Sequence, residues 1–183
     1  MKREEEAQSF DRVKLYLYLL EQDDPKKCTS LKLVRFKLAI PIYSLRQIPK
    51  NSVVLNPYAH TVFSPSDREL LRSGLVAVDC SWKRCKEVFD GWKRGMNRRL
   101  PLLWAGNPIH YGHLSILSSA EALAAALFIS GFKEQAKEVL SIFKWGSTFL
   151  SLNRYVLEDY VKCKDANEVL KVEGEYMMNL RFK

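Results

Sequence analysis

The chain has 183 residues, enough to bury a sizeable core in one domain or in two small ones. Its 29 Lys and Arg against 21 Asp and Glu give a net charge of +8, which favours a polyanion such as RNA as the partner over acidic proteins or neutral metabolites. The longest apolar run, residues 122–129, is far shorter than the roughly 20 residues of a membrane-spanning helix. No signal peptide is recognisable, so we expect a cytoplasmic protein without a membrane contact.

The first half of the chain predicts strands that alternate with helices. Residues 13–20 first alternate between apolar and more polar side chains and then become wholly apolar, as expected of a strand that is covered on both faces. Residues 53–55 predict a second, short strand. The mixed basic and apolar segment 31–39 fits a short helix or a strand. A helix is expected to open at Ser64, with acidic residues in its first turn, and to end at Gly74.

Residues 75–78 predict the central strand of an α/β sheet. Asp79 and Trp82 follow at its carboxyl end, the edge at which open α/β sheets bind ligands. A carboxylate beside an indole could hold a cation or take a proton from a weakly acidic nucleophile. A capping carboxylate and a core indole explain the same residues, and the pattern alone favours this plainer interpretation.

A strand, a long loop and a helix are expected over residues 100–122. The apolar run Pro101–Ala105 is too short for a helix and predicts a buried strand. Ser118 and Glu121 have the spacing of a capping box, which opens a helix that Gly131 ends. Ligands of α/β proteins usually bind where a strand leads through a loop into a helix, although a plain surface connection has the same pattern.

Past that glycine the pattern is helical throughout. Residues 132–144 and 148–162 each carry an apolar stripe at helical spacing, and Gly146 separates the two segments. Stripes of this kind indicate core packing rather than a cofactor site.

A second candidate site is the basic segment 83–99, in which Phe89 and Trp92 lie among the cations. RNA binding requires cations for the phosphates and aromatic faces for unstacked bases, whereas a solvated helix face is the simpler alternative. The candidate RNA-binding residues are Lys83, Arg84, Lys86, Lys93, Arg94, Arg98 and Arg99, with Lys26 and Lys27 as an extension of the same surface.

The sequence excludes several common kinds of site. It contains no GxGxxG after a strand, no P-loop, no HExxH and no GxSxG. The cysteines form no CxxC pair, and the histidines form no ligand cluster with them, so we expect no metal site and reduced, mostly buried thiols. These residues are Cys28, Cys80, Cys85 and Cys163, with His60, His110 and His113.

Six short motifs, which follow in the same order over most of the chain, resemble the ribosomal RNA aminocarboxypropyltransferases. Each motif is weak alone, but six in the same order are specific. They are DPKKCT at 24–29, SPSD at 64–67, GLVAVDCSW at 74–82, RLPLLWAGNPIHYG at 99–112, LSSAEA at 117–122 and FKWGSTFLSLNR at 143–154.

The resemblance implies a fold like that of the SPOUT-type RNA methyltransferases. It implies a mixed α/β N-terminal domain over residues 1–99, and a mainly helical C-terminal domain over residues 100–183 that completes a deep trefoil knot and the cofactor cleft. Composition alone would never indicate a knot, because knots are nearly absent from proteins.

The resemblance also implies a site for S-adenosylmethionine in the knot cleft. The polar contacts would come from Thr29, the Val78 carbonyl, Leu100, Ser115 and Ser119, and the apolar walls from Leu55, Pro57, Trp82, Leu117 and Ala122. The chain departs from the family in reading GNPIHYG where relatives often read ANPVNYG, and in having Ser115 at a position that is often aromatic. A backbone contact at that position would make the exchange harmless.

The family resemblance implies transfer of the 3-amino-3-carboxypropyl group to N3 of a modified uridine or pseudouridine in small-subunit ribosomal RNA, with release of 5′-methylthioadenosine. All three carbons on the sulfonium are electrophilic, so geometry must select one of them. Trp82 would bury the methyl group, and Asp79 is the candidate to accept or orient the N3 proton. The partner would be the RNA or a pre-ribosomal particle, and the protein a monomer. A methyltransferase of the same fold and a non-catalytic ribosome-assembly factor are the alternatives.

Overall fold

The computed structural model describes residues 10–20 and 28–181. Its centre is a sheet of five parallel strands in the order β2-β1-β4-β3-β5. The strands are β1 (Leu15–Leu19), β2 (Ile40–Ile42), β3 (Val53–Leu55), β4 (Leu75–Asp79) and β5 (Met96–Arg98). The predicted strands at 13–20, 53–55 and 75–78 are confirmed, and β4 is the central strand, as expected.

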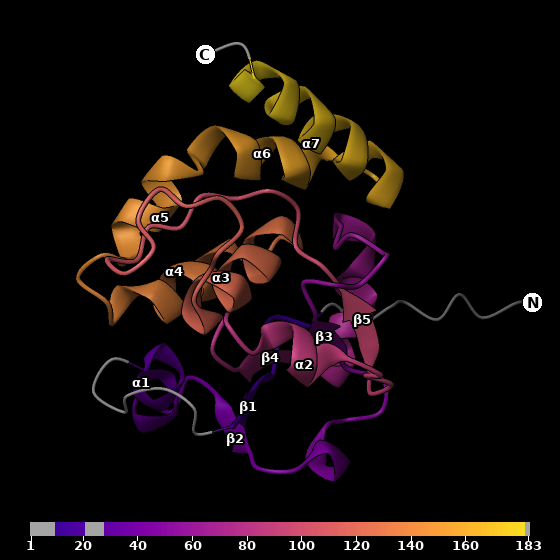
Figure 1. Ribbon diagram of the computed structural model, residues 1–183, viewed down its shortest axis with the longest axis vertical. Helices are drawn as coiled ribbons and strands as arrows, with labels where there is room; N and C mark the ends of the chain where they lie inside the picture. The colour runs from indigo at the N-terminus through magenta and orange to yellow at the C-terminus, as the bar shows by residue number, and fades with distance from the viewer. Residues whose placement is uncertain (1–9, 21–27, 182–183) are drawn as a thin grey trace, which may run out of the picture.

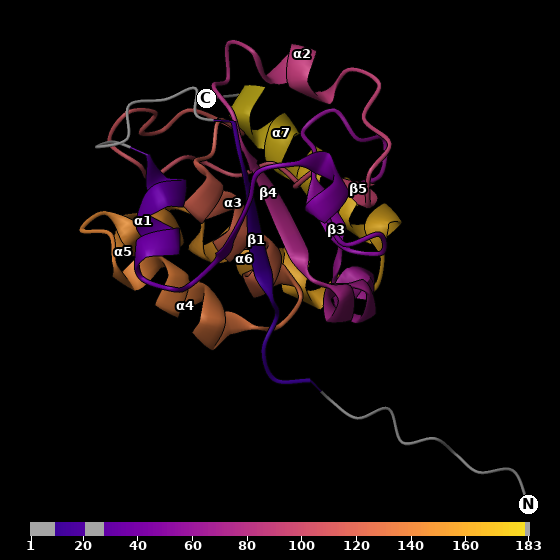
Figure 2. The same ribbon diagram turned by 90° about the horizontal axis from the view of Figure 1, so that it is seen from below.

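The helices cover both faces of this sheet (Figures 1 and 2). They are α1 (Thr29–Arg35), η1 (Leu45–Gln47), η2 (Pro65–Ser73), α2 (Cys85–Phe89), α3 (Ser119–Ile129), α4 (Lys133–Ser141), α5 (Gly146–Leu152), α6 (Arg154–Lys162) and α7 (Ala166–Arg181). The ambiguous segment 31–39 lies mostly in α1. The helix predicted to open at Ser64 is the 3-10 helix η2, with a capping box between Ser64 and Asp67 and with Gly74 as its C-cap.

Helix α3 is the centre of the main core. Every residue from Leu123 to Ile129 is buried, so the helix is covered on all sides, as a helix apolar all round must be. It contacts β4, α1, α4 and α6. The core cluster around it includes residues from Val13 to Val169, and therefore from both sides of the expected boundary at residue 99. No helix in the described parts of the chain is long and apolar enough to cross a membrane.

The strand predicted over Pro101–Ala105 is wrong. Four of its five residues are buried, but within it only Trp104 makes a β-bridge, an isolated one with Leu114. Leu103 and Ala105 make backbone hydrogen bonds with the loop residues 112–115, while Leu102 and Trp104 bond to side chains. The Trp104 N–H donates to Asn153 Oδ1 and the Trp104 carbonyl accepts from Asn153 Nδ2, both at 2.8 Å, while Leu102 N–H donates to Glu173 at 2.8 Å.

The same asparagine explains why residues 148–162 do not form one helix. Asn153 is wholly buried between α5 and α6, and its side chain also donates to the Phe149 carbonyl at 2.8 Å. Two strands were not predicted. β2 is an edge strand with Pro41 at its centre, where a missing N–H is tolerated, and β5 is a polar strand of three residues inside the basic segment.

Two glycines give contrasting predictions for stability. A Cβ at Gly106 would lie 2.6 Å from the backbone N and Cα of Phe149, whereas a Cβ at Gly174, within α7, meets nothing within 4 Å. We expect Gly106→Ala to lower the free energy of unfolding by at least about 2 kcal/mol through overpacking. Gly174→Ala should raise it by about 0.5–1 kcal/mol, because alanine loses less backbone entropy in a helix.

Urea unfolding monitored by circular dichroism measures both changes. Equal effects of the two substitutions would show that the loop at Gly106 does not pack against α5 in solution.

Candidate functional site

A large cleft lies at the carboxyl edge of the parallel strands. It encloses about 1370 Å³, more than the roughly 300–1,000 Å³ typical of a pocket for one drug-sized ligand. Its walls come from the ends of β3 and β4, the starts of α1 and α3, and the loop before α3 (Figure 1). A ligand site was predicted at this edge on the grounds of strand polarity.

The structure brings the ten predicted cofactor-binding residues around this one cleft, although they span nearly a hundred positions of the chain. These residues are Thr29, Leu55, Pro57, Val78, Trp82, Leu100, Ser115, Leu117, Ser119 and Ala122. Asp79 lines the same cleft, and it is the one Asp or Glu among the described residues that do so. The contacts that these residues make with a ligand stay a prediction.

Asp79 is held in place by donors from two helix starts. Its Oδ1 accepts from Ser30 Oγ at 2.8 Å and from Ser119 Oγ at 3.4 Å, and its Oδ2 accepts from Cys28 Sγ at 3.2 Å. Burial, together with the charge of Asp79, raises the pKa of the Cys28 thiol to about 11, so the thiol stays protonated and donates at neutral pH. The carboxylate therefore ties the end of β4 to the starts of α1 and α3.

Trp82 closes the cleft on the side of α2. Its indole N–H donates to the Leu117 carbonyl at 3.1 Å, and about a third of the residue, 36 %, is exposed. The bond fixes the turn after β4 against the loop before α3, and Trp82 lines the cleft there. The indole is therefore a wall of the cleft and not a core residue.

The loop that leads into α3 is held by Glu121, which is wholly buried. Its Oε1 accepts from the backbone N–H groups of Gly106 and Asn107 at 2.7 and 2.9 Å. Its Oε2 accepts from Asn107 Nδ2 and from the backbone N–H and hydroxyl of Ser118, at 2.7, 2.8 and 2.7 Å. The predicted capping box between Ser118 and Glu121 is confirmed, and it is part of this larger network.

Ser115 has an unusual backbone in the same loop. Its φ of 58° lies in the left-handed region that non-glycine residues rarely adopt, and its N–H donates to the Leu103 carbonyl at 2.7 Å. The residue is fixed by its backbone, and its side chain lines the cleft. A backbone contact of this residue with the ligand stays a prediction.

The family model described as "Ribosome biogenesis protein, C-terminal" matches residues 53–177. The 16S rRNA aminocarboxypropyltransferase of Methanocaldococcus jannaschii is 42% identical over 165 residues, which are 90% of this chain and 96% of the relative. The enzyme of the same name from Vulcanisaeta distributa is 49% identical over 80% of this chain and 81% of its own. This chain belongs to the 16S rRNA aminocarboxypropyltransferase family.

A solved structure of a member has the same fold. The SAM-dependent rRNA:acp-transferase Tsr3 from Vulcanisaeta distributa superposes with a TM-score of 0.80 at 42% identity, over 93% of this chain and 99% of that one. The mixed α/β architecture of this aminocarboxypropyltransferase is therefore that of the family.

A second family model, "Possible Fer4-like domain in RNase L inhibitor, RLI", matches residues 13–42. Iron–sulfur clusters are held by several cysteine thiolates, and this segment contains only Cys28. In the described part of the chain no three His, Cys, Asp or Glu residues lie close enough to hold a metal ion. The segment in this aminocarboxypropyltransferase therefore does not have the ligands of such a cluster.

The cysteine thiols are less buried than expected. None of the four cysteines forms a disulfide, but only Cys85 and Cys163 are buried, while Cys28 and Cys80 are half-buried beside the cleft.

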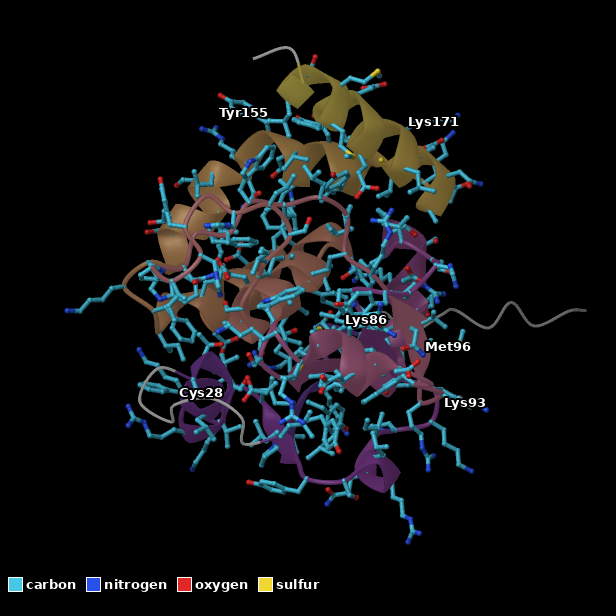
Figure 3. All side chains as sticks on the ribbon, viewed as in Figure 1. Cys28, Lys86, Lys93, Met96, Tyr155 and Lys171 are labelled. Atoms are coloured by element: carbon cyan, nitrogen blue, oxygen red, sulfur yellow. The ribbon has the colours of Figure 1, made fainter. Side chains whose placement is uncertain are left out.

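The basic segment does not form one helical face, because it contains both α2 and β5. The exposed cations of the segment are Lys83, Arg84, Lys86 and Lys93. Figure 3 labels two of them, Lys86 on α2 and Lys93 between α2 and β5. Arg94 is half-buried. Lys26 and Lys27 lie outside the described residues.

The last two arginines of the segment hold the fold together. Arg98 donates to Asp67 at 2.9 Å, and Arg99 makes a two-pronged ion pair with Glu173 at 2.8 and 2.9 Å. Their charges are largely neutralised by these partners. Of the two, Arg99 also lines the cleft.

Sequence reasoning missed Phe143 and Trp145, two residues of the helical half that line the cleft. It also missed Lys32 on α1, which lines the cleft, donates to the Ile142 carbonyl and has its ammonium 4.9 Å from the Phe143 ring centroid. The motif at 143–154 was the available signal, but no local pattern showed that its start folds back to α1.

Removing the Glu121 carboxylate should loosen the cleft and the fold together. We expect Glu121→Ala to lower the free energy of unfolding by about 3 kcal/mol or more, because several buried donors lose their acceptor at a cost of about 1–3 kcal/mol each. Glu134→Ala, which breaks an exposed ion pair with Lys137, should change it by less than about 1 kcal/mol. Chemical unfolding compares the two variants, and similar losses would contradict the central role of Glu121.

Proposed function

We propose that the chain transfers the 3-amino-3-carboxypropyl group of S-adenosylmethionine to N3 of a modified uridine or pseudouridine in small-subunit ribosomal RNA and releases 5′-methylthioadenosine. The observation that carries this proposal is the convergence of ten family positions on one cleft, beside a single held carboxylate. The relatives named above support the transferred group and the kind of RNA. The knot, the boundary at residue 99 and a monomeric state are part of the proposal and rest on the family resemblance, and a cytoplasmic location stays an expectation from the sequence.

The residues of the cleft fit S-adenosylmethionine. Its apolar walls, such as Leu55, Pro57 and Leu117, suit an adenine ring and a methyl group. The Thr29 hydroxyl can donate to a carboxylate, the Ser119 hydroxyl, whose hydrogen goes to Asp79, can accept from an ammonium, and Asp79 places one negative charge near a ligand that carries two positive ones. When bound, S-adenosylmethionine supplies three electrophilic carbons on one sulfonium.

Trp82 is the residue that we propose selects among these carbons. Its ring is fixed by the bond to the Leu117 carbonyl, so it can cover a methyl group without moving. A covered methyl group is out of reach of the RNA, while the longer carbon chain faces the open side of the cleft. A methyltransferase of this fold would need the opposite arrangement.

Asp79 could act as the base for the N3 proton or as a positioning residue. Three side-chain donors already occupy its oxygens, and two of them come from the starts of helices that line the cleft. A carboxylate engaged in this way holds geometry well but has little capacity left for a new proton. We therefore propose that Asp79 positions α1 and α3 around the ligand.

The exposed cations of the segment 83–99 are proposed to hold the RNA phosphates, with Lys26 and Lys27 on the same surface. Lys83 lies at the cleft itself, whereas Arg98 and Arg99 act first as ion-pair partners.

Chromatography of the nucleoside by-product tests the function. The protein is incubated with S-adenosylmethionine and a small-subunit RNA that lacks the aminocarboxypropyl group. We expect methylthioadenosine and added mass on one uridine. Adenosylhomocysteine would identify a methyltransferase and contradict the placement of Trp82, and RNA binding without either by-product would identify an assembly factor.

Substitution of Asp79 separates a base from a positioning residue. Asp79→Asn keeps an oxygen for Ser30 and Ser119, so we expect the transfer rate to fall less than about tenfold, whereas Asp79→Ala should lose cofactor affinity and rate together. Calorimetric cofactor binding and single-turnover rates give the two quantities. A rate loss of about 10²–10⁴-fold in Asp79→Asn with unchanged cofactor affinity would show that the carboxylate is the base.

A further inference from the structure

The net charge of the chain is concentrated in one segment. Residues 25–66 contain seven Lys and Arg and no Asp or Glu, so they account for seven of the eight units of net positive charge, and the rest of the chain is nearly neutral. Lys26 and Lys27 lie outside the described residues. The other five cations lie between the start of α1 and the start of β3, a different region from the basic segment 83–99.

Exposed aromatic rings lie among these cations. We call this surface the α1–η1 face, and its residues, all exposed, are Arg35, Phe36, Lys37, Tyr43, Arg46 and Lys50. Phe36 is 49% exposed and Tyr43 is 61% exposed, unusual values for large aromatic residues. The Arg35 guanidinium lies 5.6 Å from the centre of the Phe36 ring, so cation and ring are presented together.

The fold holds this face rigidly. Ile42 and Ile48 are buried in the smaller core cluster and anchor both ends of the segment between them. Gln47 Oε1 accepts the backbone N–H groups of Tyr43 and Ser44 at 2.8 and 3.0 Å and fixes the turn. The side chains between the two anchors are therefore directed outward by packing and hydrogen bonds.

The face begins at the rim of the cleft. Arg35 lines the cleft, together with Leu31 one helical turn before it. Helix α1 contacts β1, which pairs with β2, and Figures 1 and 2 show α1 well apart from α2. An RNA strand that enters the cleft can therefore continue across α1 and toward β2.

We propose that the α1–η1 face binds a single-stranded segment of the ribosomal RNA next to the target nucleotide. The inference rests on the proposed function, because the RNA that this face binds is the substrate of the proposed reaction. Cations without neighbouring acids suit phosphates, and exposed rings suit stacked bases. A protein partner would use the same rings and arginines, but it would need an acidic residue opposite each cation, whereas a single-stranded RNA carries a phosphate at every nucleotide.

The chain offers a substitution that removes a charge without strain. Lys37 ends α1 in the left-handed region, with a φ of 59°, where glycine is the usual residue. Lys37→Gly should therefore fold at least as readily as the natural sequence. We combine it with Arg46→Gln and Lys50→Gln, two exposed sites outside the cleft, in one triple variant.

The matched control removes three exposed cations from the opposite end of the molecule. Arg154→Gln, Lys164→Gln and Lys171→Gln lie on or next to α6 and α7, far from α1 in Figure 1, and Figure 3 labels Lys171 there. Both triple variants have the same net charge. A difference between them therefore reports position and not total charge.

RNA affinity is measured between 50 and 200 mM salt with a small-subunit fragment that spans the target uridine. Each lost phosphate contact lowers the salt slope by about 0.7–0.9. We therefore expect the affinity of the natural protein to fall roughly 20- to 40-fold more than that of the α1–η1 variant over this range. The control should behave as the natural protein, and both variants should bind S-adenosylmethionine normally.

Tyr43→Ala gives an independent test of base stacking, with Tyr155→Ala on α6 as its control. The loss of one stacked base should weaken RNA binding at least about fivefold with an unchanged salt slope. If both the triple variant and Tyr43→Ala match their controls while the natural protein still forms methylthioadenosine, the proposed RNA surface is wrong and the proposed function stands. If the natural protein forms no methylthioadenosine, the proposed function itself fails.

Discussion

The buried carboxylate of Glu121 is the interaction on which the cleft depends. A charge without water costs several kcal/mol unless it is fully hydrogen-bonded, and here five donors surround it. Those donors come from both ends of the loop 106–118, so one side chain closes the loop. The carboxylate also lies at the first turn of α3, where the helix dipole favours negative charge. The walls that include Asn107, Ser115 and Leu117 follow from this closure.

The same physical device recurs wherever the chain passes the core without joining the sheet. The Asn153 side chain forms two hydrogen bonds with the backbone of Trp104, and Gln135 does the same with Val13. Glu173 accepts a hydrogen bond from the Leu102 N–H. Each side chain supplies the donor or acceptor that a neighbouring strand would otherwise provide, because a buried backbone group must be paired. Residues 101–105 therefore have the apolar pattern of a strand, while their backbone partners are the nearby loop residues 112–115 and the side chains of two distant residues, Asn153 and Glu173.

This distinction separates what could be predicted from what could not. Strand β4, the capping boxes at Ser64 and Ser118, and the helix end at Gly131 are local, and their residues alone specify them. β2 and β5 have three residues each and take their stability from neighbours. The cleft residues were found through motif resemblance, because no periodicity shows that Thr29, Leu100 and Ser119 meet. Glu121 and Asn153 lay within those motifs, yet the structure shows that their role is to hold loops and not to line the cleft.

The distribution of charge around the cleft separates the residues that attract RNA from those that surround the cofactor. Residues 100–120, which form much of its wall, contain no Lys, Arg, Asp or Glu, whereas cations lie at its rim on Arg35 and Lys83. Charges at the rim attract a polyanion over about a Debye length, roughly 10 Å at moderate salt. The two other cations that line the cleft are already engaged, Lys32 with the Ile142 carbonyl and Arg99 with Glu173, while Asp79 supplies a negative charge that favours a cationic ligand. Attraction of RNA and selection of the cofactor are thus assigned to different residues. Salt can therefore weaken the first without much effect on the second.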